Sequence, residues 1–364
     1  MIVLESPWGL ALCAVMIGTC MGFVARRHHF CTLSALERHW YAGDSNGIRS
    51  WALAAITALA ATQLLTAAGA IEVSSSFYLT EPLPVAGSII GGLMFGFGMA
   101  LVGTCGFGAI IWLGGGNLRA LVVLTGIGLA AIAAQRGITG HLRVALFDPM
   151  RVDLSALGGQ SLGALASHVS GLDMSLAVAL LLVVAGGWWV FRDVGFRKDR
   201  GKIAAGLVIG LGIAAGWAAT SFFSQHLFDP VQIEAGSFVT PVGDTILQII
   251  TVTGAVPDYG VGLVVGIFLG AALAAWRADD MRWEACDDAR ELGRHLLGAF
   301  LMGTGGVFAL GCTIGQGVSA ASLMAVSVPL AMLSIILGAR IGLGLLVEGS
   351  AFGFLRAPSV PQGH

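Results

Sequence analysis

Charged side chains are scarce in this sequence of 364 residues. Only 11% of the residues are Asp, Glu, Lys or Arg, whereas 56% are hydrophobic and the mean hydropathy is +0.85. This composition excludes a soluble enzyme or a nucleic-acid-binding protein, because such proteins need far more polar surface. Only helices and closed barrels satisfy the backbone in lipid, and the apolar runs are helix-length rather than short and alternating. We therefore predict an all-α integral membrane protein.

Several other signals are missing as well. The first five residues lack the basic segment of a signal peptide, so we expect none. The six cysteines form no CxxC pair and lie mostly in or beside apolar segments, which argues against a disulfide framework. No Asp or Glu falls clearly inside an apolar run, so no charged proton relay is visible. We expect no catalytic residue, no cofactor and no resident metal.

Apolar runs of membrane-spanning length recur along the chain. We predict about nine spans, at residues 8–25, 48–70, 85–103, 117–135, 174–192, 203–222, 259–276, 295–311 and 321–347. Lys and Arg gather between spans one and two, five and six, and seven and eight. Basic residues mark cytoplasmic loops, so the N-terminus is predicted outside and the C-terminus inside. The stretch 135–173 fits least well, because it would lie outside yet holds Arg136, Arg143 and Arg151.

The chain contains a repeated frame of glycine and cysteine. Gly96, Gly98, Cys105 and Gly108 share their spacing with Gly303, Gly305, Cys312 and Gly315. The frames belong to spans three and eight, and an odd number of spans between them inverts the second unit relative to the first. We predict a first repeat at 1–135, a linker with span five at 136–201, a second inverted repeat at 202–350 and a short cytoplasmic tail at 351–364. Inverted repeats with broken helices meeting near the midplane are a transporter arrangement.

Each frame ends in a glycine-rich break next to its cysteine. Irregular backbone at membrane depth survives only when protein buries it or when it lines a wet cavity. Glycines permit positive φ there and leave N–H groups free to bind an anion. The predicted anion-binding loops comprise Gly103, Thr104, Gly106, Gly108, Gly311, Thr313, Gly315, Gln316 and Gly317. The start of the following helix near Asn117 carries Arg119, which either faces an anion or lies at the cytoplasmic surface.

Cys31 lies at a third break, and the stretch from Ser237 to Gly243 occupies the corresponding place in the second unit. If four breaks converge, three contribute thiols and the fourth contributes an apolar or hydroxyl surface. A thiol is soft and polarizable, and a protonated thiol does not repel an anion. Weak binding at several points suits a permeation path. Alternatively, Cys31, Cys105 and Cys312 are small packing residues beside glycine.

Three motifs together resemble one family. They are His-His-Phe-Cys-Thr-Leu-Ser-Ala-Leu with Cys31, Gly-Thr-Cys-Gly-Phe-Gly with Cys105, and Gly-Cys-Thr-Ile-Gly-Gln-Gly with Cys312. The set resembles the YeeE/YedE sulfur-transport family over nearly the whole chain. The resemblance implies a bacterial inner-membrane importer of thiosulfate, with an hourglass fold of inverted halves. It also implies that the three cysteines line the constriction and pass the ion along by S–H···S contacts, and that a small TusA-type cytoplasmic carrier is a partner.

Other functions stay open at this point. The solute could be another sulfur or selenium compound, since some relatives are linked to selenium metabolism. The same cysteines could serve a membrane redox or sulfur-transfer protein, which would need a cation next to a thiol. His28, His29 and Cys31 could hold a metal, although adjacent histidines rarely share a helix face, and a solvated cytoplasmic patch is the preferred interpretation.

Overall fold

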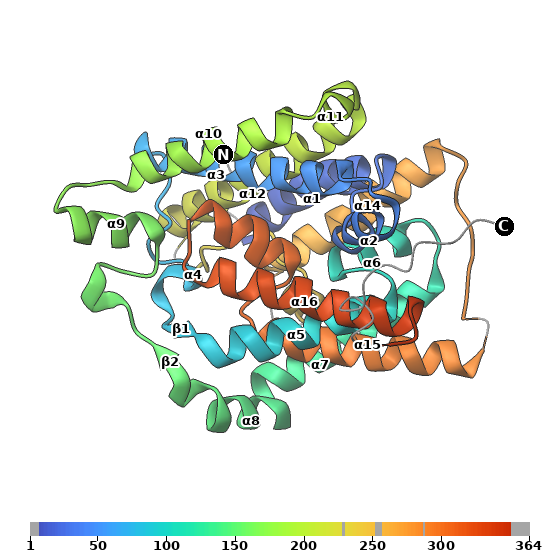
Figure 1. Cartoon of the computed structure of the whole chain (residues 1–364). Coiled ribbons are helices and arrows are strands. Elements are labelled where there is room, and N and C mark those ends of the chain that lie inside the picture. The colour runs from blue at the N-terminus through green and yellow to red at the C-terminus, as the bar shows by residue number, and fades with distance from the viewer. Residues whose placement is uncertain (1–6, 228–229, 252–256, 287, 351–364) are drawn as a thin grey trace.

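The protein is a bundle of helices with long axes running across the view in Figure 1. The computed structural model describes residues 7–227, 230–251, 257–286 and 288–350. The predicted tail at 351–364 and the first six residues lie outside these ranges. The first half comprises α1 (Pro7–Arg27), α2 (Thr32–Ala42), α3 (Asn46–Ala67), α4 (Phe77–Thr80), β1 (Leu83–Pro84), α5 (Val85–Val102), α6 (Gly106–Gly114) and α7 (Leu118–Arg136).

The remaining elements form the linker and the second half. The linker contains α8 (Ile138–Leu146), η1 (Asp148–Met150), β2 (Arg151–Val152), η2 (Ser155–Leu157), α9 (Leu162–Ser170), α10 (Ser175–Phe191) and α11 (Val194–Lys198). The second half contains α12 (Arg200–His226), α13 (Thr240–Ile250), α14 (Tyr259–Arg277), α15 (Ala289–Phe308), the π-helical turn η3 (Gly315–Ala320) and α16 (Ser327–Val347). Helices dominate, which confirms the predicted all-α membrane class.

Each predicted span coincides with a helix, but not all of these helices are long and apolar enough to cross a membrane. Seven candidates meet both criteria among the described residues; α1 with α2 and α5 with α6 each count as one. The two other predicted spans fall short. Helix α10 has 17 residues, and α15 begins with the polar sequence Ala-Arg-Glu-Leu-Gly-Arg. The number nine therefore stays a prediction.

Helix pairings in the two halves correspond to one another. Helix α1 packs on α14 while α3 packs on α12, and α5 packs on α16 while α7 packs on α15. Among these eight helices, the remaining pairs, α5 with α15 and α1 with α12, join equivalent helices. Exchanging α1, α3, α5 and α7 for α12, α14, α15 and α16 leaves this set of pairs unchanged. Such reciprocity is what a twofold relation between the halves requires; the inversion of the second repeat stays a prediction.

Glycines make the central crossing of α5 and α15 close. A Cβ on Gly98 would lie 2.6 Å from the Gly298 carbonyl oxygen, and a Cβ on Gly305 would lie 2.5 Å from that of Gly91. The two contacts are equivalent, because Gly91 and Gly298 are as far apart in the sequence as Gly98 and Gly305. Small residues allow this approach of backbones within a membrane.

The linker stretch 135–173 lies at one end of the bundle, at the left in Figure 1. Strand β2 pairs antiparallel with β1, and the Arg151 guanidinium contacts the Glu81 carboxylate at 2.7 Å and that of Asp148 at 2.9 Å. The Val326 N–H also donates to the Gln160 carbonyl, with an N···O distance of 2.9 Å. The stretch thus covers the ends of α5 and α16 instead of forming a separate domain.

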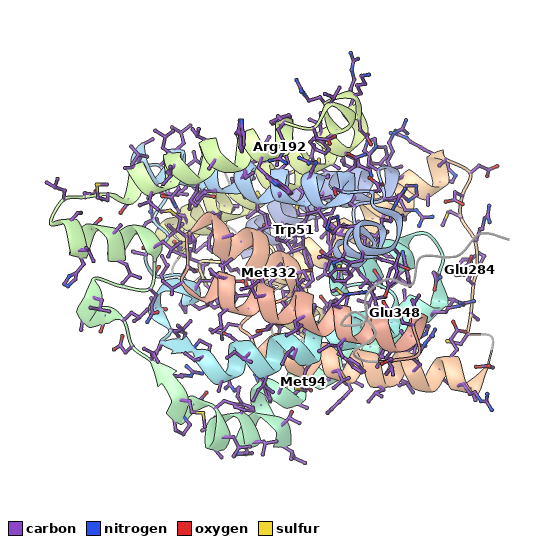
Figure 2. The ribbon with its side chains drawn as sticks, in the orientation of Figure 1. Trp51, Met94, Arg192, Glu284, Met332 and Glu348 are labelled. Carbon is purple, nitrogen blue, oxygen red and sulfur yellow. The ribbon has the colours of Figure 1, made fainter. Side chains whose placement is uncertain are left out.

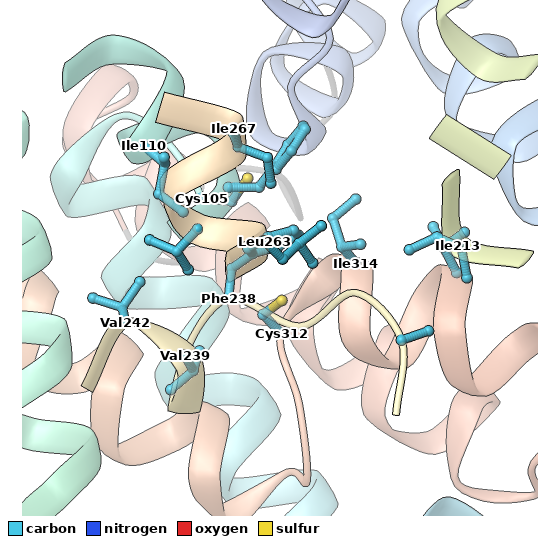
Figure 3. Packing of buried hydrophobic residues seen from close by; sticks show 14 of the residues in the cluster. Cys105, Ile110, Ile213, Phe238, Val239, Val242, Leu263, Ile267, Cys312 and Ile314 are labelled. Atoms are coloured by element: carbon cyan, nitrogen blue, oxygen red, sulfur yellow. The ribbon is translucent and has the colours of Figure 1, made fainter. Parts of the chain in front are cut away.

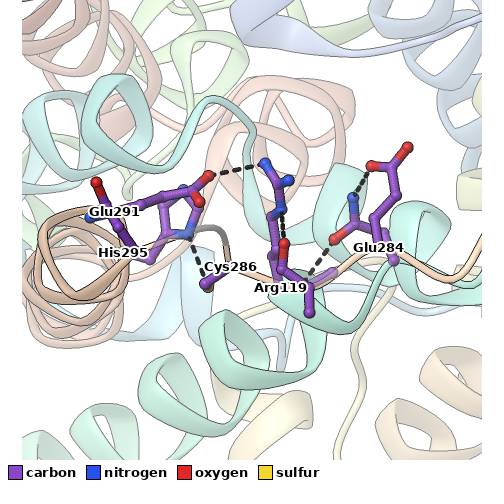
Figure 4. A network of polar contacts seen from close by, with 9 residues as sticks. Arg119, Glu284, Cys286, Glu291 and His295 are labelled. Carbon is purple, nitrogen blue, oxygen red and sulfur yellow. Dashed lines mark hydrogen bonds and ion pairs between the residues drawn. The ribbon is translucent and has the colours of Figure 1, made fainter.

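The basic connections meet at the opposite end, where Glu284 and Glu348 lie in Figure 2. Arg26 contacts the Asp280 carboxylate at 2.9 Å. Arg119 contacts Glu291 at 2.8 Å and donates to the Ala285 carbonyl, in the network of Figure 4 that also joins Cys286 to His295. Of the two roles predicted for Arg119, the structure supports the surface position.

Candidate functional site

Four helical turns converge in the interior, each at a break in the chain. Helix α2 begins after Cys31, α6 begins after Cys105, α13 begins after Val239, and a helical segment at 313–322 begins after Cys312. The prediction that Ser237–Gly243 supplies the fourth break agrees with this arrangement. Because helix N-termini carry unpaired N–H groups and a partial positive charge, their convergence favours an anion.

Side chains that follow or precede the cysteines join the four breaks. The Thr32 hydroxyl donates to the Thr313 hydroxyl at 3.2 Å, which links the Cys31 and Cys312 turns. The Phe107 ring lies 5.0 Å from the Phe238 ring, which links the Cys105 turn to the cysteine-free break. Phe30 packs edge-on against the other side of Phe107 at 6.3 Å. The breaks thus form one packed layer.

Cys105 and Cys312 have the same local geometry. The Gly108 N–H donates to the Cys105 thiol at 3.4 Å, and the Gly315 N–H donates to the Cys312 thiol at 3.3 Å. Each thiol therefore occupies the place of an N-cap side chain. Both cysteines are 1% exposed, and Figure 3 shows them in one apolar cluster beside Phe238 and Leu263.

Cys31 lies close to the Cys105 turn. Its Sγ lies 3.6 Å from the Thr104 Oγ1, and a Cβ on Gly108, whose N–H donates to the Cys105 thiol, would lie 3.5 Å from the Cys31 Sγ. The Thr32–Thr313 hydrogen bond joins the residues that follow Cys31 and Cys312. The turns that carry the three predicted site cysteines are therefore brought together.

The predicted glycines serve two different purposes. Only Gly103 and Gly311, with φ of 88° and 152°, use the positive φ that was predicted for all six. The other four are helical and instead allow close approach. A Cβ would meet the Phe238 carbonyl oxygen from Gly106, Thr104 from Gly108, Tyr78 from Gly315, and Trp51 and Met332 from Gly317, the last two being labelled in Figure 2. The prediction of positive φ at Gly106, Gly108, Gly315 and Gly317 was wrong because helical backbone resumes directly after each cysteine.

The predicted polar donors are occupied to different degrees. The Gln316 amide donates to the carbonyls of Ala309 at 2.8 Å and Leu310 at 3.3 Å, and its oxygen accepts from Ser327 at 3.1 Å. Gln316 therefore braces the turn before Cys312, and its predicted role as an anion donor has no support. Thr104 and Thr313 remain beside the thiols, as described above.

Two cavities approach this layer from opposite ends of the bundle. The Cys31 cavity, of about 150 Å³, is lined by Arg26, His29, Cys31 and Gly103 among others. The carboxylate-lined cavity, of about 380 Å³, contains Arg136, Arg143, Glu234, Asp244 and Asp258 and reaches Gly311 beside Cys312. Because Cys105 and Cys312 are almost fully buried, the layer separates the two cavities in this structure.

The carboxylate-lined cavity was not predicted as part of the site. Burial and the neighbouring Asp258 and Asp244 carboxylates raise the pKa of Glu234 to about 8. Burial and Asp258 raise the pKa of Asp244 to about 6, against the opposing effect of Arg136. The sequence placed these acids only in connections between spans, because their meeting depends on the packing of α7, α13 and α14.

Comparison with known proteins agrees with the motifs. A family model described as sulphur transport matches residues 27–341, which hold all three cysteine motifs. The chain belongs to the sulphur transport family. The thiosulfate transporter TsuA of Spirochaeta thermophila is 26% identical over 340 residues, covering 89% of this chain and 95% of that protein. The thiosulfate transporter TsuA of Escherichia coli is 25% identical over 342 residues, covering 87% and 89%. The resemblance to the YeeE/YedE family is thus confirmed.

Proposed function

We propose that this protein imports thiosulfate across the bacterial inner membrane, through the layer that carries Cys312, Cys105 and Cys31. The observation that carries the proposal is the layer of breaks with the three motif cysteines, which lies between two cavities. The similarity to two thiosulfate transporters along almost the entire chain supports the choice of ion. Family membership favours a transporter over the redox or sulfur-transfer alternative.

The helix N-termini and the thiols contribute differently to binding the ion. Taking a dianion out of water costs tens of kcal/mol by idealised solvation estimates. The converging N-termini of α2, α6 and α13 offset part of that cost with N–H groups and partial positive charge. The neutral thiols add S–H donors that suit the terminal sulfur of thiosulfate. The proposed order of contact is Cys312, then Cys105, then Cys31; Gly311, next to Cys312, lines the carboxylate-lined cavity, and Cys31 lines the other cavity, which supports these two ends of the order.

Orientation follows from the charges at the two ends. Basic residues mark the cytoplasmic side of membrane proteins, so the Cys31 cavity faces the cytoplasm and the carboxylate-lined cavity faces outside. The chain then starts outside and ends inside. A TusA-type carrier, implied by the family resemblance, would receive the ion at the basic end; co-purification of such a carrier with the membrane protein tests that partner.

Thiosulfate uptake and its competition by sulfate test the proposed function. Purified protein in liposomes is expected to take up labelled thiosulfate, whereas empty liposomes do not. Unlabelled thiosulfate should compete at least tenfold better than sulfate, a preference of about 1.4 kcal/mol, because the two dianions differ only in the sulfur that the thiols contact. Equal competition by sulfate would contradict a thiol-lined route.

Outside pH is expected to change the apparent KM through Glu234 and Asp244. A carboxyl group with a raised pKa is neutral below that pKa and charged above it, so the carboxylate-lined cavity gains negative charge between about pH 6 and pH 8. Arg136 and Arg143 face this charge, and Asp258 adds to it. Repulsion of about 1 kcal/mol across a solvated cavity raises the KM for thiosulfate by roughly fivefold from pH 6 to pH 9.

Initial rates in liposomes with separately buffered interiors check this expectation and the orientation together. Glu234→Gln should flatten the outside-pH profile while leaving uptake at pH 6 almost unchanged. If the inside pH governs the KM in oriented vesicles, the assigned orientation is wrong. If neither pH matters, the cavity charge does not control entry.

A further inference from the structure

Tyr78 buries a hydroxyl group that has no hydrogen-bond partner among the described residues. The residue is 5% exposed and lies in α4, the single helical turn between α3 and β1. Its ring packs against Phe77 at 4.0 Å and edge-on against Trp217 at 6.4 Å. A buried hydroxyl without a partner destabilises the fold, and phenylalanine would fill the same space. The hydroxyl therefore requires an explanation beyond packing.

The Tyr78 hydroxyl points at the turn that holds Cys312. The position of a Cβ on Gly315 would lie 3.0 Å from the Tyr78 Oη and 3.1 Å from the Ser237 Oγ. Gly315 is the residue whose N–H donates to the Cys312 thiol. Ser237 also lines the carboxylate-lined cavity. Two hydroxyl groups from separate parts of the chain thus converge beside the thiol nearest that cavity.

The equivalent position in the other half has a different chemistry. The Cβ of a residue replacing Gly108 would meet Thr104 and, at 3.5 Å, the Cys31 Sγ. The first half thus places one hydroxyl group, that of Thr104, and one thiol at this position, whereas the second half places the two hydroxyl groups of Ser237 and Tyr78. Hydroxyl groups are stronger donors than thiols and suit oxygen rather than sulfur. The second-half position therefore suits the oxygen atoms of a sulfur oxyanion better than the first-half position does.

We propose that Tyr78 Oη and Ser237 Oγ form an oxyanion subsite that binds the sulfonyl oxygens of the ion at Cys312. The proposal rests on the proposed function and names the residues that hold the entering ion. With its oxygens on the two hydroxyl groups, thiosulfate presents its terminal sulfur to the Cys312 thiol. Sulfate shares the oxygens but lacks the sulfur. The subsite therefore contributes affinity for both ions, whereas the thiols contribute preference for thiosulfate.

Tyr78→Phe tests this assignment, with Tyr259→Phe as the matched control. Tyr259 is 1% exposed and also has a buried hydroxyl without a partner among the described residues, but this hydroxyl meets Gly216 of α12 instead of Gly315. Loss of one hydrogen bond to a charged group should raise the KM for thiosulfate about tenfold in Tyr78→Phe. The inhibition constant of sulfate should rise by the same factor, so that the preference between the ions is unchanged. Tyr259→Phe should leave both constants at the wild-type values.

Thiosulfate-induced thermal stabilisation of the purified protein gives a second readout that does not depend on uptake. The stabilisation should shrink in Tyr78→Phe and in Ser237→Ala and persist in Tyr259→Phe; Ser237→Ala keeps the test decisive if Tyr78→Phe folds poorly. Wild-type constants in both subsite variants would overturn the subsite and leave thiosulfate import intact. A larger loss of affinity for thiosulfate than for sulfate would also overturn the subsite, because the hydroxyl groups would then contact the terminal sulfur instead of the oxygens. Absence of thiosulfate uptake by the wild-type protein would instead refute the proposed function.

Discussion

Alanine at Cys105 or at Cys312 is expected to abolish thiosulfate uptake while leaving folded protein in the membrane. Each thiol is almost fully buried at the layer between the two cavities, so alanine removes the soft donor at that point of the layer. Each contact of about 1.4 kcal/mol between the ion and a thiol corresponds to a factor of ten in the uptake rate. A variant that loses two or more such contacts therefore loses a factor of ten for each of them. Initial uptake rates in liposomes, normalised to folded protein, measure the loss.

Serine at the same positions separates the chemistry of the thiols from their structural role. Each cysteine accepts a hydrogen bond from an N–H group three residues later, and serine is a preferred N-cap residue. Cys105→Ser and Cys312→Ser should therefore fold at least as well as the wild-type protein and still lose most uptake.

Cys13→Ala is the matched control, since Cys13 is only partly buried, in α1, and away from the breaks. Its uptake should remain near the wild-type rate. Losses in all three alanine variants that follow protein abundance would favour the packing alternative. Full uptake by Cys312→Ser would mean that a soft sulfur is not required.

Local features of the site could be predicted from the sequence. A helix that ends a few residues before a cysteine and restarts directly after it depends on a short stretch of sequence, so the repeated spacing around Cys105 and Cys312 was enough to locate both breaks. The same holds for Cys31, which directly precedes α2. The relation between the frames also predicted that the breaks belong to equivalent helices.

Features that depend on assembly could not be predicted in the same way. Tyr78 and Ser237 are far apart in the chain and meet at Gly315 only after α4 and the segment before α13 are packed. Glu234, Asp244 and Asp258 likewise share a cavity because three elements converge. The amide of Gln316 was predicted to face an anion, but carbonyl groups exposed by the turn before Cys312 compete for the same donors.

Alanine at Gly96 or Gly303 is expected to reduce the yield and thermal stability of the protein sharply. A Cβ on Gly96 would overlap the Ile335 carbonyl oxygen in α16, and a Cβ on Gly303 would overlap the Ile127 carbonyl oxygen in α7. Backbone cannot give way as a flexible side chain can, so each helix pair must separate. Overpacking of this kind typically costs about 1–3 kcal/mol, equivalent to a Tm lower by roughly 5 °C.

Gly187→Ala provides the opposite expectation within the same fold. Gly187 lies inside α10, and a Cβ there meets nothing within 4 Å. Since alanine favours a helix over glycine by about 1 kcal/mol, this variant should be as stable as the wild-type protein or slightly more so.

Gly96 and Gly303 hold the same place in the repeated frame but face α16 and α7, the partners that the twofold relation exchanges. If the helices are equivalent, Gly96→Ala and Gly303→Ala should lower the Tm by equal amounts in thermal unfolding. A loss at only one of them would show that the two crossings are not equivalent.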